Sequence, residues 1–199
     1  NLIDSYYIND STFIYLNDIA VSSKKDIYIT DSESNKIYTI TNSNKQLEIY
    51  LETDEIAHSN GISISDDDKY LYLASYQNGI RIVDIESRKV LNSPEIDYGG
   101  IDGMKFYDNS LIGIVNARSD NNNNGMYRFY LNSEKTSIIR KEKLIPFGEK
   151  FNIPTTFDIV DGYIYFVINS QLDNFNQESN QVIDTNRLEP YYLMKKKIE

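Results

Sequence analysis

The chain has 199 residues, a formal net charge of −10 and no cysteine. It is long enough to bury a core in one or two domains, and without cysteine it can hold no disulfide, iron–sulfur cluster, thiolate zinc site or cysteine nucleophile. The acidic balance argues against nucleic acid as a partner, because phosphate binding needs clustered Lys and Arg. With His58 as its single histidine, the chain cannot build a multi-histidine metal site.

No apolar run approaches the roughly 18 residues that span a bilayer, and the first residues show neither the basic nor the apolar region of a signal peptide. We therefore expect a soluble protein with no membrane partner, and cytoplasmic, periplasmic and secreted locations all stay open. The abundance of Asn, Lys, Ile and Tyr is typical of an A+T-rich coding sequence and favours a bacterial source.

Short runs of aromatic and β-branched residues, each bounded by turn signals, predict strands along the whole chain. In chain order these runs are 16–21, 26–30, 36–40 and 47–51, then 59–64, 70–74, 79–83 and 89–91, then 101–106, 110–115, 125–130 and 137–145, then 154–159, 163–167 and 191–195. No segment of about 11 or more residues shows a helical stripe of apolar side chains. The chain is therefore predicted to be all-β.

The strands repeat as a unit of four. Asn17, Asn60, Asp102 and Thr155 stand at equivalent positions in the first strand of each unit, at spacings of 43, 42 and 53 residues. An insertion at 117–124, expected to form an extended hairpin loop, explains the long last step. Four strands every 40–45 residues or so predict a β-propeller, in which the first strand of each blade lines a central channel.

We expect one β-propeller domain over 1–199. Its blades are predicted at about 16–58, 59–98, 99–151 and 152–199, and residues 1–15 as the outer strand of a preceding or closing blade. Because an open stack would leave unpaired faces and edges, four blades are interpreted as part of a larger ring, with a closed four-bladed ring as the alternative.

Four motifs carry a family resemblance. Ser59-Asn60-Gly61-Ile62 and Ile101-Asp102-Gly103 stand where the family has Pro-Asn-Gly-Leu/Ile and Pro-Asp-Gly, and Leu16-Asn17-Asp18 and the hairpin at 31–37 match two further motifs. Together they cover about residues 16–115 and resemble the gluconolactonase (regucalcin-like, senescence marker protein-like) family of six-bladed propellers. Ser59 and Ile101 replace the prolines of the family motifs, and the family's Glu-Gly-Pro motif is absent from the chain.

The resemblance implies a metal-dependent hydrolase that acts on a lactone or small ester. It implies an axial divalent metal, most commonly calcium, with Asn60 and Asp102 as ligands and Asn17 facing the metal or the substrate. In the family a glutamate of the Glu-Gly-Pro motif supplies a further ligand.

The residues themselves support an axial site. Side chains at equivalent positions of successive blades point toward one axis, and carboxylate and amide oxygens suit hard cations. At such a site Asp102 could hold or deprotonate the attacking water and act as the catalytic residue. Thr155, Asn116 and Asn169 are expected at the same mouth, binding a small-molecule substrate.

A structural interpretation competes with this one. Asn-Gly and Asp-Gly are common turn pairs, and Asn at a strand end often forms a turn. His58 could be a proton shuttle or a loop residue. A non-catalytic binding or scaffold propeller is therefore the alternative function.

Overall fold

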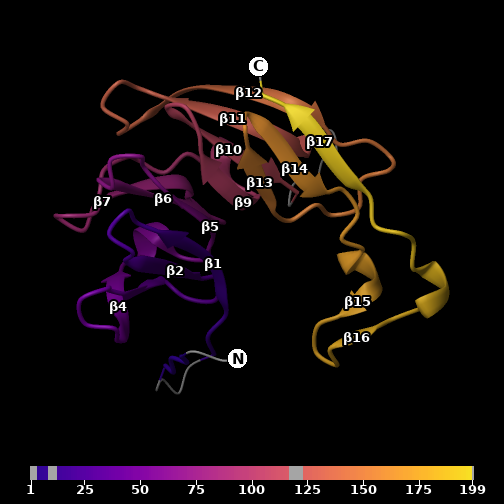
Figure 1. Ribbon diagram of the computed structural model, residues 1–199, viewed down its shortest axis with the longest axis horizontal. Coiled ribbons are helices and arrows are strands. Elements are labelled where there is room, and N and C mark those ends of the chain that lie inside the picture. The colour runs from indigo at the N-terminus through magenta and orange to yellow at the C-terminus, as the bar shows by residue number, and fades with distance from the viewer. Residues whose placement is uncertain (1–3, 9–12, 117–122, 199) are drawn as a thin grey trace.

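The computed structural model describes residues 4–8, 13–116 and 123–198. Apart from short 3-10 turns, its regular elements are strands, and the prediction of an all-β chain is confirmed (Figure 1). Residues 117–122 of the expected insertion lie outside the described residues.

The strands form antiparallel sheets in which neighbours along the chain pair with each other, except that β14 pairs with β17. Blade 1 comprises β1 (Leu16–Val21), β2 (Ile27–Asp31), β3 (Lys36–Ile40) and β4 (Leu47–Glu52). Blade 2 comprises β5 (Ser59–Ile64), β6 (Tyr70–Ser75), β7 (Gly79–Asp84) and β8 (Lys89–Val90). Blade 3 comprises β9 (Ile101–Phe106), β10 (Ser110–Val115), β11 (Gly125–Leu131) and β12 (Ile138–Pro146).

Blade 4 has three strands among the described residues, β13 (Phe157–Val160), β14 (Tyr163–Val167) and β17 (Leu193–Lys197). A small hairpin, β15 (Phe175–Asn176) and β16 (Gln181–Val182), is inserted between β14 and β17. The 3-10 turns are η1 (Asp54–Ile56), η2 (Ile96–Tyr98), η4 (Leu172–Asn174) and η5 (Thr185–Arg187). Residues 4–8 and 13–15 are irregular.

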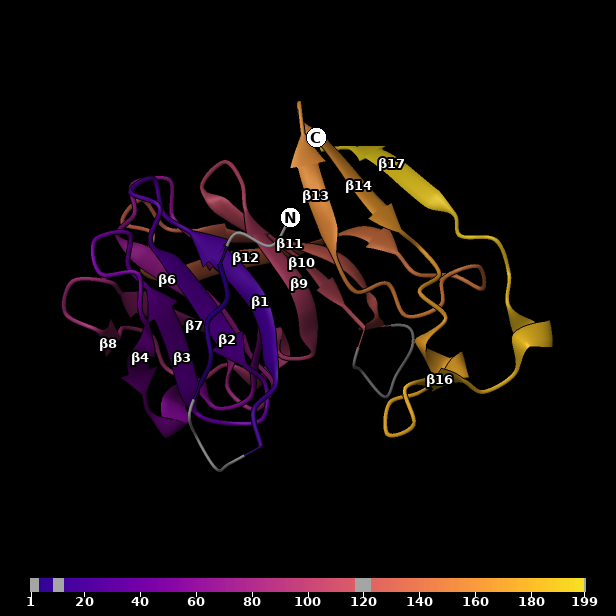
Figure 2. The same ribbon diagram turned by 60° about the horizontal axis from the view of Figure 1, so that its bottom comes forward.

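The inner strands of successive blades lie against one another. β1 packs on β5, β5 on β9 and β9 on β13, and Figures 1 and 2 show the blades following each other along an arc, with blade 1 at one end and blade 4 at the other. This is the arrangement of a β-propeller with four blades. No helix in the described part of the chain has the length and apolarity needed to cross a membrane.

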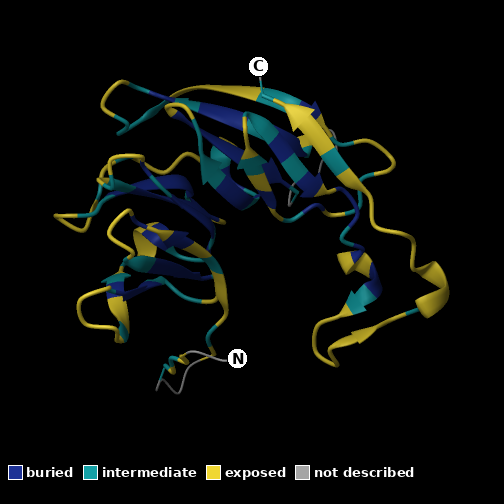
Figure 3. Ribbon diagram, in the orientation of Figure 1, coloured by how far each residue is buried: buried dark blue, intermediate teal, exposed yellow. Residues whose placement is uncertain are grey.

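The hydrophobic core lies between blades. Side chains alternate along each strand, so a blade has a leading face toward the preceding blade and a trailing face toward the next one. Between blades 1 and 2, for example, trailing Ala20, Tyr28, Ile37 and Tyr50 meet leading Ile62, Leu71, Leu73 and Val83. Figure 3 shows buried residues on the strands enclosed between blades, whereas β17 is largely exposed.

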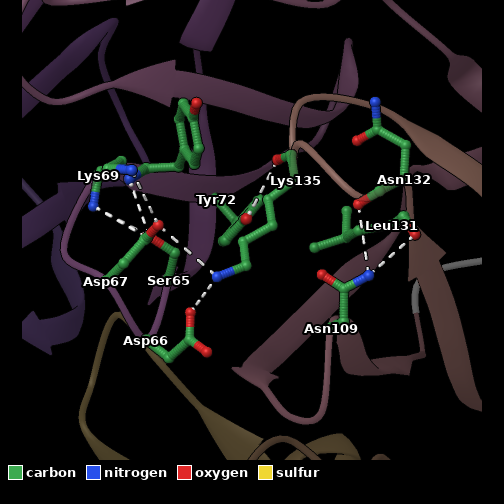
Figure 4. A network of polar contacts seen from close by, with 10 residues as sticks. Ser65, Asp66, Asp67, Lys69, Tyr72, Asn109, Leu131, Asn132 and Lys135 are labelled. Carbon is green, nitrogen blue, oxygen red and sulfur yellow. Dashed lines mark hydrogen bonds and ion pairs between the residues drawn. The ribbon is translucent and has the colours of Figure 1, made fainter.

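Blades 2 and 3 are also joined by a polar latch around Lys135, in the hairpin between β11 and β12 (Figure 4). The Lys135 ammonium group pairs with Asp66 and lies 3.7 Å from an oxygen of Asp67, both in the turn between β5 and β6. The Lys135 carbonyl accepts a hydrogen bond from the Tyr72 hydroxyl at 3.2 Å. A side chain of blade 3 thus closes over the end of blade 2.

Candidate functional site

The polar residues that begin the inner strands occupy β-bulges. In blade 2, Ser59 pairs with Ser75 and Ile62 with Leu73, so the inner strand carries one extra residue at Asn60-Gly61. The same one-residue excess occurs in blade 1 at Asn17-Asp18 and in blade 3 at Asp102-Gly103. A bulge bends the strand and re-aims its side chains. The Asn-Gly and Asp-Gly pairs therefore lie within strands and are not turns.

The glycines of these bulges allow neighbouring inner strands to approach closely. A Cβ atom on Gly61 would lie 2.2 Å from the carbonyl oxygen of Asp102, and one on Gly103 would lie 2.7 Å from the carbonyl oxygen of Thr155. The Gly103 amide donates a hydrogen bond to that Thr155 oxygen at 2.8 Å. Each bulge thus packs directly on the equivalent position of the next blade.

Asp102 is the carboxylate of this site. Burial raises its pKa, and the charge of nearby Asp18 raises it further, while hydrogen bonds from the side chains of Asn116 and Asn60 lower it; burial is the largest of these effects. Asn116 Nδ2 lies 2.9 Å from Asp102 Oδ2. The carboxylate is therefore held between two amides, with a second carboxylate close enough to disfavour its charge.

Asn116 ties this carboxylate to blade 4. Its side-chain nitrogen also donates to the carbonyl oxygen of Pro154 at 2.7 Å, next to Thr155, whose carbonyl is bound by Gly103. The structure thus brings together Asn60, Asp102 and Asn116, with the backbone of Thr155 beside them.

Asn17 and Asn169 are engaged elsewhere. Asn17 is exposed, and its amide donates to Ser32 Oγ at 2.9 Å. Asn169 is buried and holds the chain before β17, donating to the Pro190 carbonyl at 3.0 Å and accepting from the Tyr192 amide at 2.9 Å. The equivalent position in the repeat does not by itself bring a side chain to Asp102.

Asp18 is a site residue that the sequence did not single out. It stands in the bulge where blades 2 and 3 have Gly61 and Gly103. Its Oδ2 accepts a hydrogen bond from the Ile62 amide of blade 2 at 3.1 Å, and its charge acts on Asp102. The sequence pattern that could have identified Asp18 is an aspartate at the position where blades 2 and 3 carry glycine.

Two cavities adjoin this group. One of about 250 Å³ is lined by residues that include His58, Asn60 and Asn116. A larger one of about 740 Å³ is lined by residues that include Asn116, Asn152, Pro154 and Asp173. Asn116 borders both, so there is room for a small molecule beside it. His58 is fixed there by a contact of 3.0 Å between its Nδ1 and the Ser32 carbonyl oxygen.

A divalent cation at this site would be held by few acidic side chains. Among residues 4–8, 13–116 and 123–198, no group of three or more His, Cys, Asp and Glu side chains could hold a metal. Asp102 has the carboxylate of Asp18 nearby, and the side-chain amides of Asn116 and Asn60 donate N–H groups to it. Calcium accepts carboxylate and amide oxygens and takes 6–8 of them, so water or substrate would complete its shell. Asp102 and Asn60 are the residues that would hold such a cation.

No family model matches the sequence, and no curated protein matches it. Solved structures do resemble the chain. Virginiamycin B lyase from Staphylococcus aureus is 17% identical with a TM-score of 0.59, over 81% of this chain and 50% of that one. Luciferin-regenerating enzyme is 13% identical with a TM-score of 0.54, over 78% and 54%. The computationally designed Ika4 protein is 10% identical with a TM-score of 0.55, over 98% and 96%.

At these identities the likeness establishes the propeller fold alone. The chain spans about half the length of virginiamycin B lyase and of luciferin-regenerating enzyme.

Proposed function

We propose that the chain is a hydrolase-like propeller that binds a divalent cation, calcium above others, and acts on a lactone or small ester. The observation that carries the proposal is Asp102, a half-buried carboxylate whose pKa is raised by burial and by the charge of Asp18, and whose partners Asn60 and Asn116 line a cavity. Two carboxylates near each other at a channel mouth favour a cation between or beside them. Two similar structures are named as enzymes, which is compatible with this proposal.

Each residue has a chemical role in this proposal. The bound cation would polarise the substrate carbonyl as a Lewis acid. Asp102 orients a water molecule and accepts its proton, a task that a carboxylate of raised pKa performs better. Asn116 is a positioning residue, because it fixes the Asp102 carboxylate from one side. Asn60 offers its amide oxygen to the cation from blade 2.

Calcium titration of the purified chain by calorimetry, together with thermal unfolding, tests the site. Calcium at 100 times its Kd should add about 2.7 kcal/mol to the free energy of unfolding, and Asp102→Asn should abolish both the binding heat and this gain. Asp84→Asn is the matched control, since Asp84 ends β7 at the opposite end of the blade. Absence of divalent binding, or hydrolysis of a lactone panel that survives Asp102→Ala unchanged, would contradict the proposal.

A non-catalytic binding or scaffold module is the second candidate. It is favoured by the hydrogen bonds that already engage Asp102, Asn17 and Asn169 within the chain and by the absence of the Glu-Gly-Pro motif. Calcium binding at Asp102 with no turnover of any lactone would support this alternative.

A further inference from the structure

The segment between β14 and β17 is much longer than its counterparts in blades 1 and 2. The second and third strands are joined by residues 32–35 in blade 1 and by residues 76–78 in blade 2, whereas residues 168–192 separate β14 from β17. In Figures 1 and 2 this excursion reaches away from the blade and carries the β15–β16 hairpin. Ordering each extra residue costs conformational entropy, and three or four residues suffice to join two strands of a blade. The blade itself therefore does not require the excursion.

The excursion is nevertheless held in one arrangement by buried side-chain amides. The Gln171 amide donates to the Glu189 carbonyl at 3.0 Å and accepts from the Glu189 N–H at 2.8 Å. Asn174 makes the same pair of bonds with the backbone of Asp184, at 2.7 and 3.0 Å. Fully bonded polar groups of this kind make a segment rigid and specify a single conformation. The excursion is thus a fixed wall beside blade 4.

This wall and residues 147–154 line two large cavities. The cavity of about 740 Å³ and a second one of about 900 Å³ share Glu149, Asn152 and Asp173 in their linings. Each volume lies within the range of small-ligand pockets, about 300–1,000 Å³. Because the two cavities share lining residues, they adjoin, and together we call them the blade 4 cleft.

Asp173 lies where the two cavities meet and is held from both walls. Its Oδ1 accepts a hydrogen bond from the Asn152 amide at 2.8 Å, and its Oδ2 pairs with Arg187 Nη2 of η5 at 2.9 Å. Asn152 Oδ1 and the other guanidinium N–H groups of Arg187 have no partner within the described part of the chain. The centre of the cleft therefore offers an acceptor and several donors in fixed positions.

The charges in the cleft nearly balance. Its lining carries three acidic side chains and two basic ones, which are Glu149, Asp173 and Glu189, and Lys150 and Arg187. An anionic ligand would lie beside the acidic groups and a cationic ligand beside the basic ones, so neither sign of charge is favoured. A neutral ligand that both donates and accepts hydrogen bonds along its length suits this lining, and the hydroxyl groups of sugars do both.

Each cavity also has aromatic side chains in its lining. Phe147 and Phe151 stack with their ring centres 4.7 Å apart at the smaller cavity, and Tyr192, which is 53% exposed, lines the larger one. The C–H groups on the face of a sugar ring carry a partial positive charge, and the face of an aromatic ring is negative. The cleft thus has one place for a sugar ring to stack in each cavity.

We propose that the blade 4 cleft binds a neutral oligosaccharide, with one sugar ring on Phe151, another on Tyr192, and hydroxyl groups bonded to Asn152 and Arg187. Two adjoining cavities of this size accommodate a ligand of more than one ring. The site lies outside the Asp102 group, although Asn116 borders the smaller cavity. This binding function goes beyond the proposed hydrolase and does not depend on it.

A glycan array probed with the labelled full chain, followed by calorimetric titration of the oligosaccharides that bind, tests this proposal. Tyr192→Ala and Arg187→Ala should each weaken binding roughly 10-fold, because they remove a stacking ring and a charged donor. Tyr191→Ala is the control for the first, since Tyr191 is 67% exposed and does not line the cleft. Arg140→Ala is the control for the second, since Arg140 is 57% exposed and pairs with Glu142 at 2.9 Å on β12.

EDTA and Asp102→Asn separate this proposal from that of the cation site. Sugar binding should persist under both conditions, whether or not calcium binds at Asp102. Binding that either condition abolishes would overturn the proposal, and so would an array without any bound glycan or binding that Tyr192→Ala and Arg187→Ala leave unchanged. A peptide array bound in an Arg187-dependent way, with the glycan array empty, would assign the cleft to a protein partner and overturn it as well.

Discussion

At the scale of single residues, Asp102 is a charge placed where the fold disfavours it. Burial and Asp18 raise its pKa, and the amides of Asn116 and Asn60 offset only part of that effect. A carboxyl group whose pKa is higher in the folded than in the unfolded state stabilises the fold below its unfolded pKa of about 3.9. That contribution is lost as the pH rises through the folded-state pKa. The site therefore costs stability at neutral pH, as functional sites often do.

Removing this charge should stabilise the protein at neutral pH without a cation. In EDTA at pH 7 we expect Asp102→Asn to raise Tm by about 2–4 °C, the shift that about 1 kcal/mol produces in a domain of this size. The gain should shrink as the pH falls through the raised folded-state pKa of Asp102, and it should be absent below the unfolded value of about 3.9. Thermal unfolding monitored by circular dichroism from pH 4 to 7 measures it.

Asp84→Asn should have the opposite pH dependence. Hydrogen bonds from the Ser87 hydroxyl and amide lower the Asp84 pKa. The contribution of the Asp84 carboxylate to the stability of the fold is therefore present at neutral pH and lost on acidification. If Asp102→Asn lowered Tm at pH 7 as Asp84→Asn does, the carboxylate would be a stabilising structural group.

The sequence was sufficient to predict that Asn60 and Asp102 share a position, because both stand in the same bulge of the repeat. It could not predict where each amide makes its hydrogen bonds. Asn17 shares that bulge, but Ser32 of the adjacent hairpin turn binds its amide. Such partners depend on turns that differ between blades, and the register of the repeat does not specify them.

At the scale of elements, the first three blades follow their sequence pattern, because apolar and turn residues alternate with the period of short strands. Blade 4 departs from it between β14 and β17. Three buried side-chain amides hold this excursion to the blade by hydrogen bonds to backbone atoms. Asn169 binds the backbone of Pro190 and Tyr192, Gln171 binds that of Glu189, and Asn174 binds that of Asp184. Polar side chains that bind distant backbone have no periodicity, so this segment could not be predicted from strand patterns.

The close packing at the bulge glycines leads to a prediction about stability. Gly61→Ala should destabilise the protein by about 2–3 kcal/mol, the upper range for overpacking, because its Cβ would meet the backbone oxygen of Asp102 at 2.2 Å. Gly148→Ala is the matched control, with no atom within 4 Å of its Cβ. Urea unfolding of both variants measures the difference in free energy. Equal stability of the two would show that the inner strands separate easily.

At the scale of the whole molecule, stability depends on contacts between blades, since each blade contacts mainly its neighbours along the arc. The apolar layers supply most of that contact, and the Lys135 latch adds a polar one between blades 2 and 3 (Figure 4). The Lys135 side chain is 18% exposed, and its ammonium group lies 5.7 Å from the Phe106 ring centre. Partial burial and a second acidic partner distinguish it from an ordinary surface ion pair.

Lys135→Ala should therefore cost about 1 kcal/mol, at the top of the range for exposed pairs, and loosen the junction of blades 2 and 3. Lys69→Ala is the control. Lys69 also pairs with Asp67, at 3.5 Å, but the two residues lie in one turn and the Lys69 side chain is 66% exposed, so this substitution should cost a few tenths of a kcal/mol at most.

A double-mutant cycle of Lys135→Ala with Asp66→Ala isolates the pair, and hydrogen exchange of β8 and β12 amides reports the junction. Hydrogen bonding to Asp66 raises the Lys135 pKa, so the contribution should persist at pH 10 and disappear only above it. A coupling energy of zero would show that the ion pair contributes nothing and that only the apolar layer joins the two blades.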